Sequence, residues 1–366
     1  MTIRSGSAAE GTYPRFEGRG LVFWYQATRL ARASASCRYR LGHFAERLRG
    51  ATTVVDPKPS LEVLAKARTL VVVRPYLDDA CRRLLEGCRD RGVRLVADFD
   101  DLLFAGEPTD YPLVLSGALS ETECAERIER YRVGLSVFDA FTAATEALRD
   151  RLVEALPDAD VAWTPNGLSG LWLRQGHALY PRWSPGEPRV VRFLAGSPSH
   201  DADLAQVVSV LGEFLRGRLD VRLEIVGPVR LEPGHLPADR VSFRALVPYL
   251  ELPRLLASSW VTIAPLRPSP FTRCKSAIKF LESAAFGAPC IASSSDAAPW
   301  PDATRHREGG ILLAGDESEW WEALNRMMDD DERRAVGRRA ETWVAQHGLA
   351  HRGARALSAW AAPEAP

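Results

Sequence analysis

Two lysines and a glutamate form the arrangement in this sequence that is best suited to chemistry. The chain has only four lysines, and two of them, Lys275 and Lys279, lie four residues apart, with Glu282 three residues further on. In a helix these three side chains share one face. Ammonium groups near the first turns of a helix favour an anion, so the spacing predicts a diphosphate site in which Glu282 accepts hydrogen bonds from a ribose. The alternative is a solvated helix face on which Glu282 pairs with Lys279.

Strands and helices alternate along the chain in two successive runs, as in parallel sheets covered by helices on both faces. In the first run we expect strands at residues 21–25, 53–55, 69–73, 93–97, 140–143 and 161–164, and helices at 39–48, 61–67, 78–91, 120–137 and 145–156. In the second run we expect strands at 189–195, 221–226, 241–243, 260–264, 289–292 and 311–314, and helices at 201–216, 249–258, 274–287, 316–329 and 331–347.

The alternation predicts an α/β protein with two Rossmann-like domains that face a central cleft. The first domain covers residues 20–170 and the second covers 189–347, joined by a linker at 171–188 that holds Trp, Gly and Pro without a helical period. Residues 1–19 lack an apolar signal core and are expected to form a disordered leader. Residues 348–366 are expected to be a tail that crosses back to the first domain. Ligands bind parallel α/β sheets at the carboxyl ends of the strands, so the cleft is the expected site.

Several short motifs follow these strands and carry a family resemblance. In the second half they read Gly196-Ser-Pro-Ser-His200, Ile225-Val-Gly227, and Lys275-Ser-Ala-Ile-Lys279-Phe-Leu-Glu282 with Ala285-Phe-Gly287-Ala-Pro289-Cys-Ile-Ala292. They resemble the donor domain of retaining glycosyltransferases of the GT-B fold, in particular family 4. In the first half, Asp98-Phe-Asp-Asp101 and Pro165-Asn-Gly167 resemble landmarks of the acceptor domain of the same enzymes.

The resemblance implies transfer of a sugar from a nucleoside diphosphate sugar to a hydroxyl acceptor, with retention and without a metal. Because negative charge grows on the leaving diphosphate, the catalytic residues it implies are Lys275, Lys279 and His200. The implied donor-binding residues are Gly196, Ser197, Gly227, Arg273, Lys275, Ser276, Lys279 and Glu282. The implied acceptor-binding residues are Tyr39, Arg40 and Asp100.

Two positions depart from the family pattern. Cys274 stands where the family has the first glutamate of a Glu-x7-Glu pair, which puts the contact to the donor sugar in doubt. The Arg…Lys pair that often follows the first strand of the donor domain is missing, and the loop here contains His200 instead. These departures are consistent with a divergent enzyme or with an inactive relative.

The Asp98-x-Asp100-Asp101 tract suits a hard divalent cation by its chemistry. It lies in the first domain, away from the expected nucleotide site, so we expect helix capping or acceptor contact there and neither a metal nor another cofactor. Arginines gather near the loop after the first strand, where an anionic acceptor or a membrane surface is one interpretation and arginine-rich composition is the other. Tyr39 and Arg40 are the acceptor contacts we favour in this set.

The bulk composition limits the remaining classes. The formal net charge is zero over 366 residues, which gives no indication of nucleic acid binding. The six cysteines lack paired Cys-x-x-Cys spacing and are expected to be reduced. We therefore expect a cytoplasmic bacterial protein, with the inner face of the membrane as a further place of action. We expect a role in surface polysaccharide or glycoconjugate assembly, with a glycan, lipid-linked or small-molecule acceptor. A GT-B nucleotide-sugar epimerase and a non-catalytic partner protein of the same fold remain as alternatives.

Overall fold

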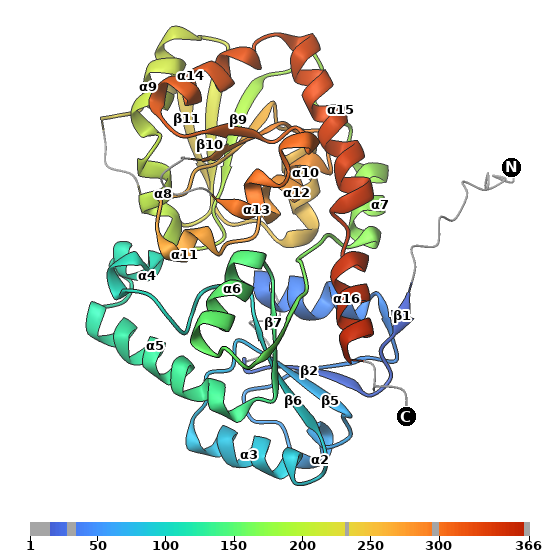
Figure 1. The fold of residues 1–366 in the computed structure, drawn as a ribbon. Helices are drawn as coiled ribbons and strands as arrows, with labels where there is room; N and C mark the ends of the chain where they lie inside the picture. Colours follow the sequence, from blue (N-terminus) through green and yellow to red (C-terminus); the bar gives the residue numbers. More distant parts are fainter. Residues whose placement is uncertain (1–14, 28–33, 231–233, 295–299, 362–366) are drawn as a thin grey trace, which may run out of the picture.

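The computed structural model describes residues 15–27, 34–230, 234–294 and 300–361, and it confirms the predicted pair of α/β domains (Figure 1). Each domain is built on a six-stranded sheet in which all neighbouring strands are parallel. The strand order is β4-β2-β5-β6-β7-β8 in the first domain and β11-β10-β9-β12-β13-β14 in the second. Residues 1–14 of the expected leader lie outside the described residues, whereas Phe16–Glu17 (β1) pairs with Leu48–Arg49 (β3) and is therefore structured.

The first sheet comprises β2 (Leu21–Tyr25), β4 (Thr52–Val55), β5 (Thr69–Val73), β6 (Arg94–Phe99), β7 (Ala140–Ala143) and β8 (Asp160–Trp163). Its helices are a π-helical turn (Cys37–Gly42), α1 (His43–Ala45), α2 (Leu61–Leu64), α3 (Asp79–Arg89), α4 (Pro112–Leu115), α5 (Glu121–Gly134) and α6 (Glu146–Ala155). Side chains alternate between the two faces of a strand, so Val22 and Trp24 join the core under α2, α3, α5 and α6. Leu21 and Phe23 point to the opposite face.

The second sheet comprises β9 (Arg189–Leu194), β10 (Val221–Val226), β11 (Val241–Arg244), β12 (Val261–Ala264), β13 (Cys290–Ser293) and β14 (Leu312–Ala314). Its helices are α7 (Gly170–Leu179), α8 (Asp201–Ala205), α9 (Val208–Gly217), α10 (Leu252–Ala257), α11 (Pro270–Arg273), α12 (Ile278–Ala284), α13 (Pro301–Thr304), α14 (Glu317–Arg326) and α15 (Asp330–His347). The core on one face is formed with α9 and α14, and the core on the other with α7, α10, α12 and α15.

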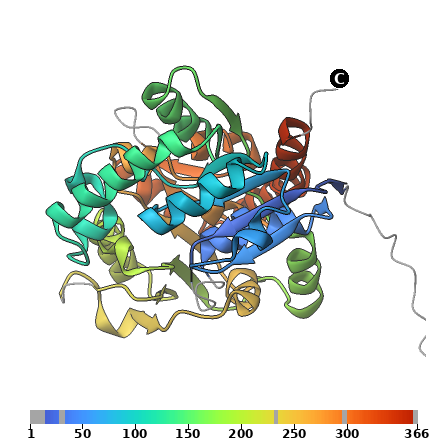
Figure 2. The ribbon, with the colours of Figure 1, turned by 90° about the horizontal axis from the view of Figure 1, so that it is seen from below.

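The C-terminal part of the described chain returns to the first domain. The last helix, α16 (His351–Ala361), packs on the first sheet, where Ala354 and Leu357 join Leu21 and Phe23 in one apolar cluster. The Trp360 indole also donates to the Asp160 carboxylate at 2.8 Å. Figure 2, seen from below, shows this red helix beside the blue strands of the first domain. A segment far along the chain thus covers one face of the first sheet.

The linker prediction for 171–188 is wrong in its first part. Residues Gly170–Leu179 form α7, whose N-terminus is capped by the Ser169 hydroxyl accepting from the Trp172 amide at 3.1 Å. The Trp172 ring stacks on the Tyr249 ring, with centroids 4.8 Å apart, so this helix belongs to the second domain. None of the helices in the described part of the chain is long and apolar enough to cross a membrane.

Candidate functional site

A cavity of about 670 Å³ lies between the two domains. It opens at the carboxyl ends of β5 and β6 in the first domain and of β9, β10 and β12 in the second, which is where parallel sheets bind ligands. Residues of both domains line this cleft, among them Arg38, Tyr39, Arg74, Asp100, Gly196, His200, Tyr249, Lys275, Ser276, Lys279 and Glu282. The sequence-predicted residues thus largely come together, although they come from separate elements.

The two lysines do not share a helix, in contrast to the predicted helix at 274–287. That segment divides into α11, which ends at Arg273, and α12, which starts at Ile278. The break is held by the second domain itself, because the Trp300 indole donates to the Lys275 carbonyl at 2.5 Å and the Asp302 carboxylate accepts from the Ala277 amide at 2.6 Å. The Lys275 carbonyl and the Ala277 amide are thus bonded to side chains, whereas in a continuous helix they would bond to other backbone groups of that helix. Lys275 therefore reaches the cleft from a loop and Lys279 from the first turn of α12.

Lys279 is a buried cation without a hydrogen-bond partner among the described residues. Its ammonium nitrogen is enclosed and lies 5.1 Å from the centre of the Phe193 ring. Burial lowers the pKa of Lys279 to about 8, against the attraction of Asp203 and together with the repulsion of Lys275. An unpaired ammonium in such a place is unfavourable unless an anion completes it.

His200 faces the same part of the cleft and is held by Asp203. Its Nδ1 atom lies 2.8 Å from the Asp203 carboxylate, and burial, followed by the charge of Lys279, lowers the pKa of His200 to about 4. A carboxylate only accepts, so the neutral imidazole carries its proton on Nδ1 and its Nε2 atom is unprotonated. Sequence reasoning missed Asp203. The signal in the sequence was that Asp203 lies three residues after His200. The helix predicted over 201–216 is also divided, into α8 and α9, next to the β-branched Val207 and Val208.

Of the two predicted glycines near the strand ends, Gly196 is among the residues that line the cavity and Gly227 is not. Gly227 has a φ of +111°, and a Cβ atom there would lie 1.9 Å from the Ala195 carbonyl oxygen, so only glycine fits beside the end of β9. Gly196 lines the cleft, and a Cβ atom on it would meet nothing within 4 Å. The Ser197 hydroxyl lies 2.6 Å from that of Ser199.

Ser276 meets the first domain across the cleft. Its hydroxyl accepts from the Asn166 side-chain amide at 3.0 Å, and both residues line the cavity. Because Asn166 belongs to the turn that follows β8, this bond joins the loop before α12 to the first domain. The predicted donor contact of Ser276 stays a prediction.

Glu282 contacts Tyr39, which was predicted to bind the acceptor. The Tyr39 hydroxyl donates a short hydrogen bond to the Glu282 carboxylate, and the two residues belong to opposite domains. Burial raises the pKa of Glu282, while the Tyr39 hydroxyl, Arg38 and Lys279 oppose the rise and favour the carboxylate. Glu282 is thus placed in the cleft as predicted, with one of its oxygens already engaged.

Arg38 is a cleft residue that sequence reasoning did not single out. Its guanidinium lies 3.8 Å from the centre of the Tyr249 ring, and its Nε atom is enclosed without a hydrogen-bond partner among the described residues. The sequence signal was present, because Arg38 belongs to the arginine-rich segment after the first strand. The neighbouring Arg40 was chosen in its place.

Arg40 lies in the interior of the first domain, in contrast to the predicted acceptor contact. It is 1% exposed and donates to both oxygens of Asp98, at 2.9 and 2.5 Å, and to the Thr164 carbonyl, the Thr164 hydroxyl and the Asn166 side chain. These five bonds use all five N–H groups of a guanidinium. Arg40 therefore ties together β6 and the loop after β8 and has no donor left for an acceptor.

Asp100 does reach the cleft, where Arg74 binds it. Arg74 forks between the carboxylates of Asp100 and Asp101. Burial alone would raise the pKa of Asp100, yet the adjacent Arg74 lowers it below its usual range. Arg74 has a φ of +51°, which is unusual for a residue with a side chain and which the two ion pairs help to stabilise. The described residues contain no group of three or more His, Cys, Asp or Glu side chains that could hold a metal ion.

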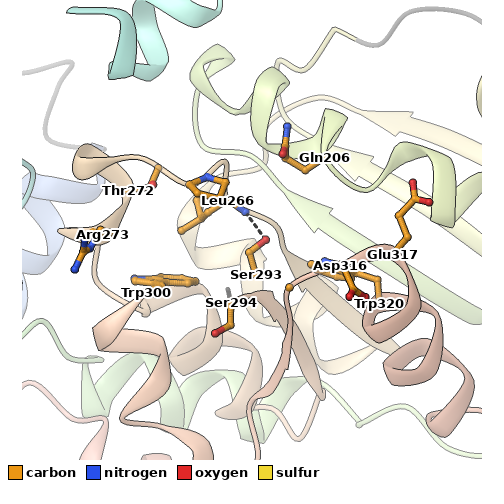
Figure 3. Close-up of a pocket in the computed structure, with 12 residues that line it drawn as sticks. Gln206, Leu266, Thr272, Arg273, Ser293, Ser294, Trp300, Asp316, Glu317 and Trp320 are labelled. Carbon is orange, nitrogen blue, oxygen red and sulfur yellow. Dashed lines mark hydrogen bonds between the residues drawn. The ribbon is translucent and has the colours of Figure 1, made fainter. Parts of the chain in front are cut away.

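Arg273 lines a different cavity from the two lysines. It lines a second cavity of about 280 Å³, together with Gln206, Thr272, Ser293, Ser294 and Trp320 (Figure 3). This cavity adjoins the cleft, because Leu266 and Trp300 line both. The prediction that Arg273 neutralises the diphosphate beside Lys275 therefore gains no support from its place.

Cys274 points into the first domain. Its side chain is 1% exposed and joins the apolar cluster of that domain with Phe271, whose ring lies 4.9 Å from the Tyr111 ring. Burial raises the pKa of the Cys274 thiol to about 12, so it stays neutral. It therefore supplies interdomain packing in place of a carboxylate.

Residues 196–330 match the family model of glycosyl transferases group 1. No curated protein sequence matches the chain. Among solved structures, sucrose-phosphate synthase from Thermosynechococcus elongatus aligns with a TM-score of 0.61 at 14% identity, over 93% of this chain and 98% of that one. Anabaena Alr3699/HepE in complex with UDP and glucose aligns with a TM-score of 0.58 at 14% identity, over 93% and 99%.

A putative UDP-N-acetylglucosamine 2-epimerase from Listeria monocytogenes aligns with a TM-score of 0.51 at 13% identity, over 90% of this chain and 94% of that one. At such low identity these similarities concern the fold. Together with the two parallel-sheet domains, they confirm the predicted GT-B fold.

Proposed function

We propose that this chain, a GT-B-fold protein whose residues 196–330 match the glycosyl transferases group 1, moves a sugar from a nucleoside diphosphate sugar to a hydroxyl acceptor. The donor would occupy the cleft between the domains. The acceptor would enter from the first-domain side, near Asp100. Retention at the anomeric carbon and independence of a metal ion belong to the same proposal.

The unpaired ammonium group of Lys279 is the observation that carries this proposal. It is enclosed, lacks a hydrogen-bond partner among the described residues, and lies in the cleft with Lys275 and His200. A diphosphate would supply the missing negative charge and hydrogen-bond acceptors. The backbone around Gly196 is open to the cavity and offers further donors.

The rest of the cleft matches the other parts of a nucleotide. Glu282 has an oxygen available for ribose hydroxyl groups. Leu246, Val247 and Pro248 form an apolar part of the lining, next to Leu252, that suits a base. Among the relatives in fold, the Anabaena protein was captured with UDP and glucose, which supports a nucleotide-sugar donor for this chain.

The chemistry follows from where charge develops. As the bond between the anomeric carbon and the diphosphate oxygen breaks, negative charge grows on the leaving group, and Lys275 and Lys279 stabilise it. Asp100 and Asp101 are tied to Arg74 and Glu282 is engaged by Tyr39, so we assign none of them as a nucleophile. The acceptor hydroxyl then attacks from the face that the diphosphate leaves and gives its proton to the departing phosphate oxygen. This course retains the configuration.

The neutralisation by lysines is also why we propose a metal-free reaction. The two ammonium groups take the role that a divalent cation has in other phosphoryl-leaving-group enzymes. A role in bacterial surface polysaccharide or glycoconjugate assembly stays a prediction from the sequence. So do a glycan, lipid-linked or small-molecule acceptor, cytoplasmic placement and peripheral membrane association.

Cys274 favours a second candidate function, a non-catalytic protein that binds nucleotide sugars. Its buried, neutral thiol cannot make the contact to the donor sugar that a glutamate makes at this position in the resembling enzymes. Such a protein would keep the nucleotide site and lack turnover. The two functions differ in one readout, the release of free nucleoside diphosphate.

The test is to incubate the protein with UDP-glucose, GDP-mannose and dTDP-glucose, in EDTA or in Mg²⁺, with and without a mixture of hydroxyl acceptors. Release of nucleoside diphosphate that needs an acceptor and persists in EDTA is the expected result. Binding of a donor without any release would contradict transfer and favour the non-catalytic function. Formation of an epimer or free sugar without acceptor would identify a different reaction of the same fold.

A further inference from the structure

Tyr39 belongs to the first domain and donates a hydrogen bond to a residue of the second domain. It lies in the π-helical turn Cys37–Gly42, is 3% exposed, and packs edge-on to the His43 ring with centroids 4.9 Å apart. Its hydroxyl donates to Oε1 of Glu282, a residue 243 positions away in the sequence. Burial, and then the charge of Glu282, raises the pKa of Tyr39 well above its ordinary value, so the phenol keeps the proton that it donates.

The hydrogen bond from Tyr39 makes the two oxygens of the Glu282 carboxylate unequal, because only one of them has a donor among the described residues. A carboxylate has two acceptor oxygens, and the vicinal hydroxyl groups of a ribose can engage both. Here Oε1 is engaged by Tyr39, and no described residue donates to Oε2. Glu282 lines the cleft, so Oε2 is the carboxylate oxygen that depends on a bound nucleotide for a donor, whereas Oε1 already has one.

The loss of a ribose hydroxyl is costly when it leaves a buried acceptor without a donor. A site built around such a hydroxyl rejects the analogue that lacks it, because the protein group is then unsatisfied. Tyr39 removes this penalty at Glu282. Oε1 keeps its donor whether the sugar is a ribose or a 2′-deoxyribose, and the remaining 3′-hydroxyl can serve Oε2.

We propose that Tyr39 sets the nucleotide class of the donor site by making it tolerant of a 2′-deoxyribose, so that deoxyribonucleoside diphosphate sugars belong to its substrates beside ribonucleoside diphosphate sugars. This inference rests on the proposed donor site and names the substrate class of that site. Tyr39 is a positioning residue in it, because it acts through the carboxylate of Glu282.

A calorimetric comparison of UDP and 2′-deoxy-UDP tests the inference on the whole protein. For the wild type we expect the two dissociation constants to agree within about threefold, less than the usual effect of leaving one buried acceptor unsatisfied. In Tyr39→Phe, Oε1 loses its donor, so the ribose 2′-hydroxyl is then needed to donate to Oε1 and strengthens nucleotide binding. The ratio of the two dissociation constants should then rise to about tenfold or more in favour of UDP.

The matched control is Tyr111→Phe, which removes another buried hydroxyl near the domain interface. Tyr111 donates to the Ala105 carbonyl at 2.8 Å and does not line the cleft, so its replacement should leave the ratio unchanged. A change in overall stability alone would alter both dissociation constants together and leave the ratio unchanged.

Several results would overturn the inference. The first is a wild type that already rejects 2′-deoxy-UDP by about tenfold or more, the effect expected of an unsatisfied buried acceptor. The second is a Tyr39→Phe protein that binds both nucleotides more tightly by the same factor, which would make Tyr39 a blocking group. If neither nucleotide binds the wild type, the donor site itself is contradicted, whereas an unchanged ratio in Tyr39→Phe contradicts only the role of Tyr39.

Discussion

The two walls of the cleft use their charges differently. On the first-domain side all five N–H groups of Arg40 are engaged by Asp98, Thr164 and Asn166, and Arg74 is paired with two adjacent carboxylates. On the second-domain side Lys279 has no hydrogen-bond partner among the described residues. Both walls are rich in cations, so the presence of a cation does not by itself mark a ligand site.

The difference shows which charges maintain the fold and which await a ligand. A buried guanidinium with all its donors engaged gains nothing from an anion in the cleft, and its removal leaves a carboxylate without a partner. A buried ammonium without a partner gains a great deal from an anion, and its removal relieves an unfavourable burial. Saturation of hydrogen bonds, rather than the type of residue, separates the two roles.

Arg40→Leu should have the largest effect, and that effect should be on stability. Among the described residues, the substitution leaves the buried Asp98 carboxylate with only the Thr142 hydroxyl as a side-chain donor. This should lower the free energy of unfolding by about 3–5 kcal/mol. Denaturant unfolding of the whole protein measures this change in the free energy of unfolding. Arg83→Leu, at an exposed position of α3, is the control. Equal stability of the two variants would show that the saturated network does not support the fold.

The pH dependence of nucleotide binding should give an effect of intermediate size. The pKa of Lys279 is about 8 in the free protein, and a bound diphosphate raises it. Below pH 8 the ammonium is present both free and bound, whereas above pH 8 binding must take up a proton. The affinity should therefore fall by up to about tenfold per pH unit between pH 8 and 9.5.

Lys279→Arg removes this titration, because a guanidinium stays charged throughout the range. Its affinity should lack the fall above pH 8, and any titration of the nucleotide itself would appear in both proteins. Titrations in buffers that differ in their heat of ionisation would also count the proton taken up. A wild type whose affinity does not change between pH 7.5 and 9.5 would show that Lys279 does not meet the diphosphate.

Arg38→Met should have the smallest effect and sharpens the comparison. Arg38 belongs to the first domain, where the other two arginines maintain the fold, yet its Nε atom has no hydrogen-bond partner among the described residues. Its domain therefore predicts a role in the fold, whereas its unused donor predicts a role in binding a ligand. If saturation decides, the variant should bind nucleotide about fivefold more weakly, the loss of roughly 1 kcal/mol. Its melting temperature should stay close to that of the wild type. Unchanged binding would restrict donor binding to the second domain.

Much of the fold could be predicted from the sequence, because the signals are local. The apolar run at Thr69–Val73 and the capping threonine Thr145 are each contained in a few residues, and the structure has β5 and α6 at these places. The broken helix before α12 could not be predicted this way. It depends on Trp300 and Asp302, which bind its backbone from 25 residues further along the chain.

The candidate site divides along the same line. Lys275, Lys279 and Glu282 line the cleft, although the single helix from which their common face was predicted is broken before α12. Arg40 was misassigned because its partners lie 58 to 126 residues away, and only the folded chain shows that all of its donors are engaged. Arg38 and Asp203 were missed for the related reason that their importance depends on what surrounds them.

The most direct test of the account is a calorimetric titration of UDP, GDP and dTDP into the wild type, Lys279→Met and Lys66→Met, with melting temperatures measured in parallel. Lys66 is exposed and does not line the cleft, so it is a matched control. We predict that at least one nucleotide binds the wild type and Lys66→Met equally, and binds Lys279→Met at least about tenfold more weakly, or about 1.4 kcal/mol. The melting temperature of Lys279→Met should not fall. Wild-type affinity in Lys279→Met, or no binding of any nucleotide to the wild type, would contradict the account.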